Sequence, residues 1–125
     1  MIADEDLERL VDRFYAKVRR DDLIGPLFNS AVADWPEHLV KLGAFWSSVM
    51  NCSGRYKGSP MAAHLRHVAS IEPRMFKRWI ALWRETAREE LTADQADAVV
   101  AKAERISESL QLGLFFKPEP RGAAA

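Results

Sequence analysis

The chain has 125 residues, of which 48% are hydrophobic, and its 18 basic residues balance 18 acidic ones. This length predicts one domain with one core, and the absence of net charge argues against nucleic acid as a partner. No segment approaches the roughly 20 apolar residues of a membrane helix, and the N-terminus has no signal-peptide pattern. Cys52 is the single cysteine, which predicts a reducing, cytoplasmic location, and we expect it to be a small buried filler without a role.

The first amphipathic helix is predicted between residues 4 and about 20, where apolar side chains recur with helical spacing. Tyr15 lies at the border of that apolar stripe, so we expect a buried ring whose hydroxyl either has a partner or reaches solvent. The next segment, 21–28, predicts only a turn or two of helix, broken at Gly25-Pro26. This segment is therefore expected to be a tight corner.

A second long helix is predicted from the capping residue Asp34 to about Asn51, with Glu37 at the capping-box position. Its two overlapping apolar stripes are Leu39, Leu42, Trp46 and Val49, and His38, Leu42 and Phe45. His38 thus has two interpretations. It either looks into the interior from the first turn or lies half in solvent at the helix N-terminus.

A short helix carries two of the three histidines. Ser59 is expected to cap it and Pro60 to occupy its first turn. One apolar stripe is predicted on this helix, formed by Met61, Leu65 and Val68, and His64 lies on the same side. An inward histidine is either a core residue hydrogen-bonded to a carbonyl or a ligand, and this helix alone does not decide between the two.

Two further helices complete the chain. One begins near Pro73 and buries Phe76, Trp79, Ile80, Trp83 and Ala87 on one face, with Trp83 as a core residue whose indole N–H needs an acceptor. The other begins at the capping box Thr92–Gln95 and is expected to end at Gly113. We predict an all-α fold with four long and at least two short helices, a domain over residues 1–116 and a flexible tail over 117–125.

The sequence contains no complete catalytic motif of a common kind. The spacing His64-x-x-His67 occurs at zinc sites, but no further ligand or carboxylate base is nearby in the sequence, and His67 lies closer to the wet flank of the helix. No nucleophile elbow or phosphate-binding glycine loop is present. An inward His64, a facing helix with an inward His38 and an apolar, aromatic interior together favour a flat slot with one axial nitrogen, which fits haem.

The ordered motifs of the chain resemble a family. They are Phe14-Tyr15, Leu23-Ile-Gly-Pro-Leu-Phe28, Trp35-x-x-His38, Phe45-Trp46, Tyr56-x-Gly58-x-Pro60, His64 and Phe76-x-x-Trp79. Together they resemble the truncated haemoglobins of group III, over about residues 7–116. None of the six glycines is adjacent to another, whereas the other truncated groups carry paired glycines. The resemblance implies a shortened globin fold in which two helices pack over two around the haem.

The resemblance also implies roles for single residues. His64 matches the proximal ligand of the haem iron, Tyr15 and Trp79 match the distal hydrogen-bonding pair, and His38 matches the distal-helix position that faces the iron. We expect the apolar lining of haem b to be formed by Phe14, Leu42, Phe45, Met61, Leu65, Phe76 and Ile80. We expect the haem propionates to be held by Arg55, Tyr56 and Arg66, each of which can equally be a solvated surface residue.

The implied function is binding of dioxygen, nitric oxide or carbon monoxide at a five-coordinate iron. Two distal donors predict slow dioxygen release, which favours redox chemistry on the bound gas over oxygen transport, either as a nitric oxide dioxygenase or by peroxidase-like activation of peroxide. The alternatives are a non-enzymatic store or sensor of gas, and a helical interaction protein without a cofactor. An unidentified reductase is expected as a partner, no membrane or nucleic acid is, and the chain is expected to be a monomer or weak dimer.

Overall fold

The computed structural model describes residues 2–115, which form helices and connections without a strand. The helices are α1 (Asp4–Val18), α2 (Gly25–Ala31), α3 (Trp35–Asn51), α4 (Pro60–Leu65), α5 (Pro73–Glu90) and α6 (Ala93–Phe115), with a 3₁₀ turn at Val68–Ser70. The prediction of an all-α fold with four long and at least two short helices is confirmed. No helix within these residues is long and apolar enough to cross a membrane. The predicted domain boundary at 116 and the predicted tail 117–125 lie outside the described residues.

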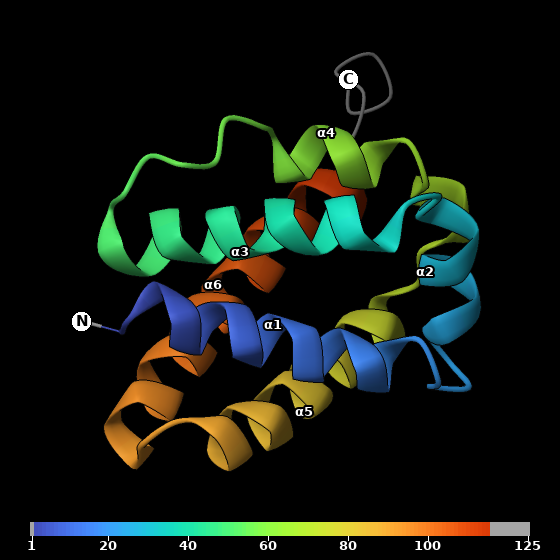
Figure 1. Ribbon diagram of the computed structural model, residues 1–125. Coiled ribbons are helices and arrows are strands. Elements are labelled where there is room, and N and C mark those ends of the chain that lie inside the picture. Colours follow the sequence, from blue (N-terminus) through green and yellow to red (C-terminus); the bar gives the residue numbers. More distant parts are fainter. Residues whose placement is uncertain (1, 116–125) are drawn as a thin grey trace, which may run out of the picture.

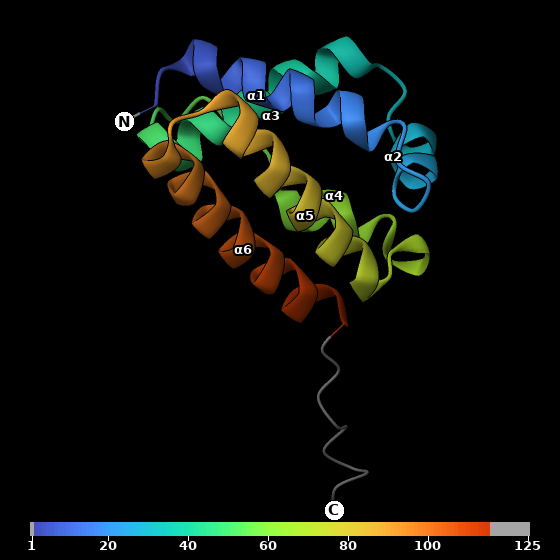
Figure 2. The same cartoon turned by 90° about the horizontal axis from the view of Figure 1, so that it is seen from below.

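The four long helices form two layers (Figures 1 and 2). The first layer is α1 with α3, and the second is α5 with α6, which crosses the first at an angle. Contacts between α1 and α5 join the two layers, whereas α4 packs mainly against α6. The backbone of α3 makes no extensive contact with α4 or α5. The side of α3 that faces the second layer is therefore covered by side chains rather than by a closely packed helix.

The helix starts follow the sequence pattern. The Asp34 carboxylate accepts a hydrogen bond from the Glu37 amide at 3.1 Å, and the Ser59 hydroxyl accepts one from the Ala62 amide at 3.2 Å. Thr92 and Gln95 each accept a hydrogen bond from the other's backbone N–H at 3.3 Å, which is the reciprocal capping box. These caps satisfy amides that the first turn of a helix leaves unpaired, so the three predicted starts are confirmed.

The core is centred on Trp83 of α5. Its ring is fully buried and its indole N–H donates to the Val99 carbonyl at 3.2 Å, as predicted for a core tryptophan. The Trp46 ring of α3 stacks on the Trp83 ring with 4.4 Å between their centroids, and the Trp79 ring stacks on Trp83 at 5.4 Å. Phe14 of α1 meets Trp83 edge-on at 4.9 Å. This aromatic cluster fixes how α1, α3 and α5 pack together.

Two predicted helix breaks are wrong. Gly25-Pro26 does not interrupt a helix but begins α2, because proline suits the first turn and buried Gly25 lies where a Cβ would come within 3.0 Å of the Val18 carbonyl. Gly113 does not end α6, which continues to Phe115. A Cβ at Gly113 would lie 2.6 Å from the Met61 sulfur. This glycine therefore serves the packing of α4 on α6 rather than the end of the helix.

Two further predictions about burial are wrong. Cys52 is exposed rather than buried, because it follows the last turn of α3 in a left-handed conformation with φ 54°. The apolar stripe predicted for the short helix is not buried as a whole: Leu65 is 48% exposed and Val68 is 37% exposed. The helix is only six residues long, and Met61 alone of this stripe packs into the cluster of Phe76, Leu110 and Leu114.

Candidate functional site

His64 lies in the last turn of α4, half-buried, with its ring 6.4 Å from Phe76 of α5. Its Nδ1–H donates to the Pro60 carbonyl at 2.6 Å, because a carbonyl oxygen can only accept. That bond orients the ring and leaves the lone pair of Nε2 available in the neutral tautomer. The helix contains no buried residue, so His64 is not a core histidine. His67, the other histidine of the pair, is exposed.

The surroundings of His64 do not suit a zinc site. Within residues 2–115, no three histidine, cysteine or acidic side chains lie close enough to share a metal ion. A structural zinc site requires four such ligands and a catalytic one usually three. A single imidazole with one ring nitrogen held by a carbonyl is instead the arrangement by which globins hold haem iron.

One face of α5 connects His64 to the predicted distal pair. Phe76 and Trp79 are three residues apart and so lie one turn from each other on the same side of the helix. Phe76 stacks towards the His64 ring, while Trp79 meets Phe14 edge-on at 5.0 Å. Phe14 in turn contacts Tyr15 at 4.7 Å. The residues predicted to lie on opposite sides of a haem thus border the same α5 face.

Tyr15 is buried, with only 4% of its surface exposed. The alternative expectation, a hydroxyl that reaches solvent, is therefore not supported. Burial raises the pKa of the phenol well above its usual range, and the neighbouring Trp79 indole opposes that rise in part. The hydroxyl therefore keeps its proton at any physiological pH and can donate a hydrogen bond. Trp79 itself is half-buried, so its indole is not sealed into the core as that of Trp83 is.

His38 lies in the first turn of α3, half-buried, beside the Tyr15 ring. The centroids of these two rings are 6.2 Å apart, and Trp35 lies 5.6 Å from His38 on the same helix. Burial lowers the pKa of His38, and the nearby charge of Lys41 lowers it further. The ring is therefore neutral at neutral pH. The ring combines the two interpretations, since it lies half in solvent in the first turn of α3 and faces the buried Tyr15 ring on its other side.

The predicted apolar lining is distributed over four helices, α1, α3, α4 and α5. Most of these side chains are only half-buried: Leu42 and Phe45 on α3, Met61 on α4, and Ile80 on α5. Phe76 is nearly buried, Phe14 is fully buried behind Tyr15 and Trp79, and Leu65 is exposed. Half-buried large apolar side chains on the helices next to His64 and the distal pair, together with one available imidazole nitrogen, fit a flat apolar cofactor, so the residues present suit haem.

The three predicted propionate partners lie apart. Tyr56 is half-buried with its ring 5.1 Å from that of Phe45, at the edge of the apolar lining. Arg66 is exposed at the end of α4. Arg55 instead reaches α1, where its guanidinium lies 3.0 Å from a carboxylate oxygen of Asp4 and 3.9 Å from one of Glu8. The structure thus gives Arg55 carboxylate partners of its own on another face of the molecule.

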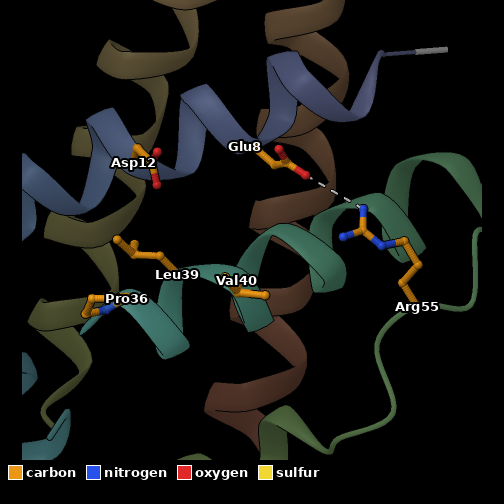
Figure 3. Close-up of a pocket in the computed structure, with 6 residues that line it drawn as sticks. All are labelled: Glu8, Asp12, Pro36, Leu39, Val40 and Arg55. Carbon is orange, nitrogen blue, oxygen red and sulfur yellow. Dashed lines mark ion pairs between the residues drawn. The ribbon is translucent and has the colours of Figure 1, made fainter. Parts of the chain in front are cut away.

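A cavity of about 360 Å³ lies on that face (Figure 3). Glu8 and Asp12 project into it from α1, its floor is formed by α3, and Arg55 closes one end. The apolar side chains that line it are Pro36, Leu39 and Val40. It contains none of the residues that surround His64 and Tyr15. This cavity is therefore separate from the candidate site.

Two aromatic residues near Tyr15 were not predicted as site residues. Phe28 of α2 lies 5.7 Å from the Tyr15 ring and Trp35 lies 5.9 Å from it. Both occur in the motifs that carry the family resemblance, but helical periodicity gives no signal for their role because they lie on other helices. They complete an aromatic enclosure around the phenol.

Comparisons with known proteins agree on one family, although no protein-family model matches the chain. The chain is 30% identical over 118 residues to the group 3 truncated hemoglobin ctb of Campylobacter jejuni, covering 91% of this chain and 92% of that protein. It also matches the crystal structure of a group III truncated hemoglobin from Campylobacter jejuni, with a TM-score of 0.85 and 28% identity, covering 96% of this chain and 97% of that one. The predicted shortened globin fold is thereby confirmed. The chain belongs to the group III truncated haemoglobins, and so to the haem globins that bind diatomic gases.

Proposed function

We propose that this protein holds haem b through His64 and retains dioxygen beside Tyr15 and Trp79 for redox chemistry on the bound gas. The observation that carries the proposal is the buried phenol of Tyr15, which keeps its proton and lies within an aromatic enclosure that the Trp79 indole borders. Burying a hydroxyl costs free energy unless it has a partner. The Trp79 indole already hydrogen-bonds the Tyr15 hydroxyl, and because an indole N–H can only donate, the phenol proton remains available to a polar ligand that accepts it.

His64 is the proposed iron ligand because its Nδ1–H is engaged by the Pro60 carbonyl and its Nε2 is left to bind. Haem held there would supply a redox-active iron that can accept a diatomic gas. The half-buried apolar residues of α3, α4 and α5 are proposed to exclude water from the bound gas. Tyr56 and Arg66 remain the proposed partners of the propionates, together with Arg55 if it leaves Asp4.

Tyr15 and Trp79 are proposed to donate to the gas as it gains negative charge. Donors that are already oriented in a dry site stabilise charge without reorganisation. A hydrogen bond to a charged group contributes roughly 1.5–3 kcal/mol, so two of them slow release by about a hundredfold or more. Slow release is poorly suited to oxygen transport and well suited to reaction with a second molecule, such as nitric oxide or peroxide.

The competing proposal is a store or sensor of gas, which delivers its ligand unchanged. Stopped-flow mixing of the dioxygen-loaded protein with nitric oxide distinguishes the two. We expect rapid and stoichiometric consumption of nitric oxide with formation of nitrate, and repeated turnover once a reductase returns the iron to the ferrous state. Release of intact dioxygen that outpaces any reaction with nitric oxide or peroxide would favour the store.

A further inference from the structure

The corner between α1 and α2 contains a carboxylate that is almost completely buried. Only 6% of the Asp21 side chain is exposed. One of its oxygens accepts hydrogen bonds from the Leu23 and Ile24 amides, each at 3.0 Å, and the other accepts one from Arg78 Nε at 2.7 Å. Burial opposes ionisation of Asp21, but the Ile24 amide and the Arg78 guanidinium outweigh it and hold its pKa below the usual range. Asp21 is therefore a fixed charge that joins three segments.

Each of these segments holds part of the distal enclosure. The two amides that bind Asp21 immediately precede α2, which carries Phe28 against the Tyr15 ring. Arg78 is the residue next to Trp79 on α5, so the direction of its side chain fixes how α5 is rotated about its axis at that point. A rotation of the helix there would turn the Trp79 indole relative to the Tyr15 hydroxyl.

We propose that Asp21 and Arg78 are positioning residues for the distal donors Tyr15 and Trp79. The inference rests on the proposed function, because the Asp21–Arg78 ion pair can affect gas binding in this way only if Tyr15 and Trp79 donate to the bound gas. Among the described residues, no hydrogen bond or ion pair joins Asp21 or Arg78 to the proposed haem ligand His64. It acts by holding the α1–α2 corner and α5 in the one relative position that lets both donors converge, as the supporting residues of a preorganised site do.

Lys17 provides the matched control, because it joins α1 to α5 away from the α1–α2 corner. Its ammonium lies 2.8 Å from Glu85, nearly two turns beyond Trp79 along α5, and also pairs with Glu89. Lys17→Gln thus removes a cation from the same interface without touching the α1–α2 corner. Arg78→Gln and Asp21→Asn remove the two members of the proposed pair, and Arg78→Lys retains its charge.

The experiment measures dioxygen dissociation and the infrared C–O stretch of the carbon monoxide complex in the haem-loaded variants. We expect Arg78→Gln and Asp21→Asn each to raise the dissociation rate several-fold and to add a second C–O band from molecules with weakened hydrogen bonding. We expect Lys17→Gln to keep the parental rate within about twofold, as for an ordinary surface pair, and a single band. Arg78→Lys should recover most of the parental behaviour, because an ammonium can still pair with Asp21.

Tyr15→Phe separates failure of this inference from failure of the proposed function. If Tyr15→Phe changes the rate and the band while Arg78→Gln changes neither, the ion pair does not position the donors. If Tyr15→Phe itself changes neither, the donor pair of the proposed function is wrong. An equal change in Lys17→Gln and Arg78→Gln would also overturn the inference, because it would show a general loosening of the α1–α5 interface. Arg78 is half-exposed, so its substitution tests the proposal even if Asp21→Asn does not fold.

Discussion

The two ends of α5 differ in how completely their side chains are buried and hydrogen-bonded by the protein itself. At the end near Trp83 the rings are fully buried, the indole has a carbonyl acceptor, and Thr86 donates to the Leu82 carbonyl at 2.7 Å. At the end near Phe76, the neighbouring helix α4 packs mainly on α6 and buries no residue of its own, and His64 keeps one ring nitrogen available. The first end is complete as a protein core, whereas the second carries the side chains of the proposed haem site.

This difference separates stability from function along one helix. Fully packed aromatic residues contribute several kcal/mol each to folding, whereas half-exposed ones contribute much less. Substitutions near Trp83 should therefore change the free energy of unfolding. Substitutions around His64, Tyr15 and Trp79 should change haem retention and gas kinetics, with smaller effects on the fold. The predictions below test that separation, beginning with the largest expected effect.

Trp83→Ala should lower the free energy of unfolding by about 3–5 kcal/mol, because it leaves a cavity among Trp46, Phe14 and Trp79 and removes the hydrogen bond to the Val99 carbonyl. Urea unfolding followed by circular dichroism measures this change. The matched control is Trp35→Ala, which removes a half-buried tryptophan from the edge of the structure and should cost clearly less. Equal losses in the two variants would show that the core is not concentrated at Trp83.

His64→Ala should abolish stable haem binding and leave the unfolding of the haem-free protein within about 0.5 kcal/mol of the parent, since α4 buries no residue. The absorbance ratio of the Soret band to the protein band after purification measures haem retention. His67→Ala is the control, because it removes the exposed histidine of the same segment and should retain haem. Loss of haem in His67→Ala together with retention in His64→Ala would show that the ligand is His67 and not His64.

Tyr15→Phe and Trp79→Phe should each accelerate dioxygen dissociation by about tenfold, since each removes one hydrogen bond of at least about 1.4 kcal/mol. Rapid mixing of the dioxygen-loaded protein with excess carbon monoxide measures the rate. Tyr56→Phe removes a proposed propionate partner but no distal donor, so it should weaken haem retention and leave the rate within about twofold of the parent. Rates within about twofold of the parent in both distal variants would be too small for lost hydrogen bonds of this size.

The packing of α5 around Trp83 could be predicted from the sequence. The arrangement at the other end of α5, near His64, could be predicted only in part. Helical periodicity and capping residues identified α1, α3, α5 and α6, because each long helix buries one stripe in the protein itself. The same rule failed for Leu65 and Val68, since the apolar face of a one-and-a-half-turn helix is not set by protein packing alone.

Contacts between helices far apart in the sequence left no local signal at all. The pairing of Asp21 with Arg78 joins residues 57 positions apart, and Gly113 reads as a helix end although it accommodates Met61. Pairing of this kind depends on the tertiary arrangement, which periodicity does not encode. The distal and proximal candidates could nevertheless be named, because the family resemblance supplies the arrangement that the residues alone do not.

His38 should govern how quickly a gas reaches the distal side, without binding the iron permanently. Its backbone is held in the first turn of α3 by the Asp34 cap, so its ring moves mainly by rotation about its side-chain bonds. Binding an iron would require an approach to about 2 Å, and we expect the neighbouring Tyr15 ring, 6.2 Å from the His38 ring, to crowd the space that His38 would have to cross. We therefore expect an open sixth position and a ring that alternates between a buried and a solvent-facing rotamer.

The lowered pKa of His38 gives this gate a pH dependence with a definite sign. The folded state prefers the neutral ring, so the contribution of the ring to stability is complete above its unfolded pKa and is lost as the pH falls through the lower folded value. Protonation should turn the ring towards solvent, so carbon monoxide association, measured by flash photolysis, should become faster as the pH falls below the ordinary histidine pKa of about 6.5. His38→Ala should associate several-fold faster at every pH, without this dependence and with its proximal bond unchanged. A gas-free ferrous spectrum that is six-coordinate and low-spin in the parent, and five-coordinate in His38→Ala, would instead make His38 an internal ligand that every incoming gas must displace.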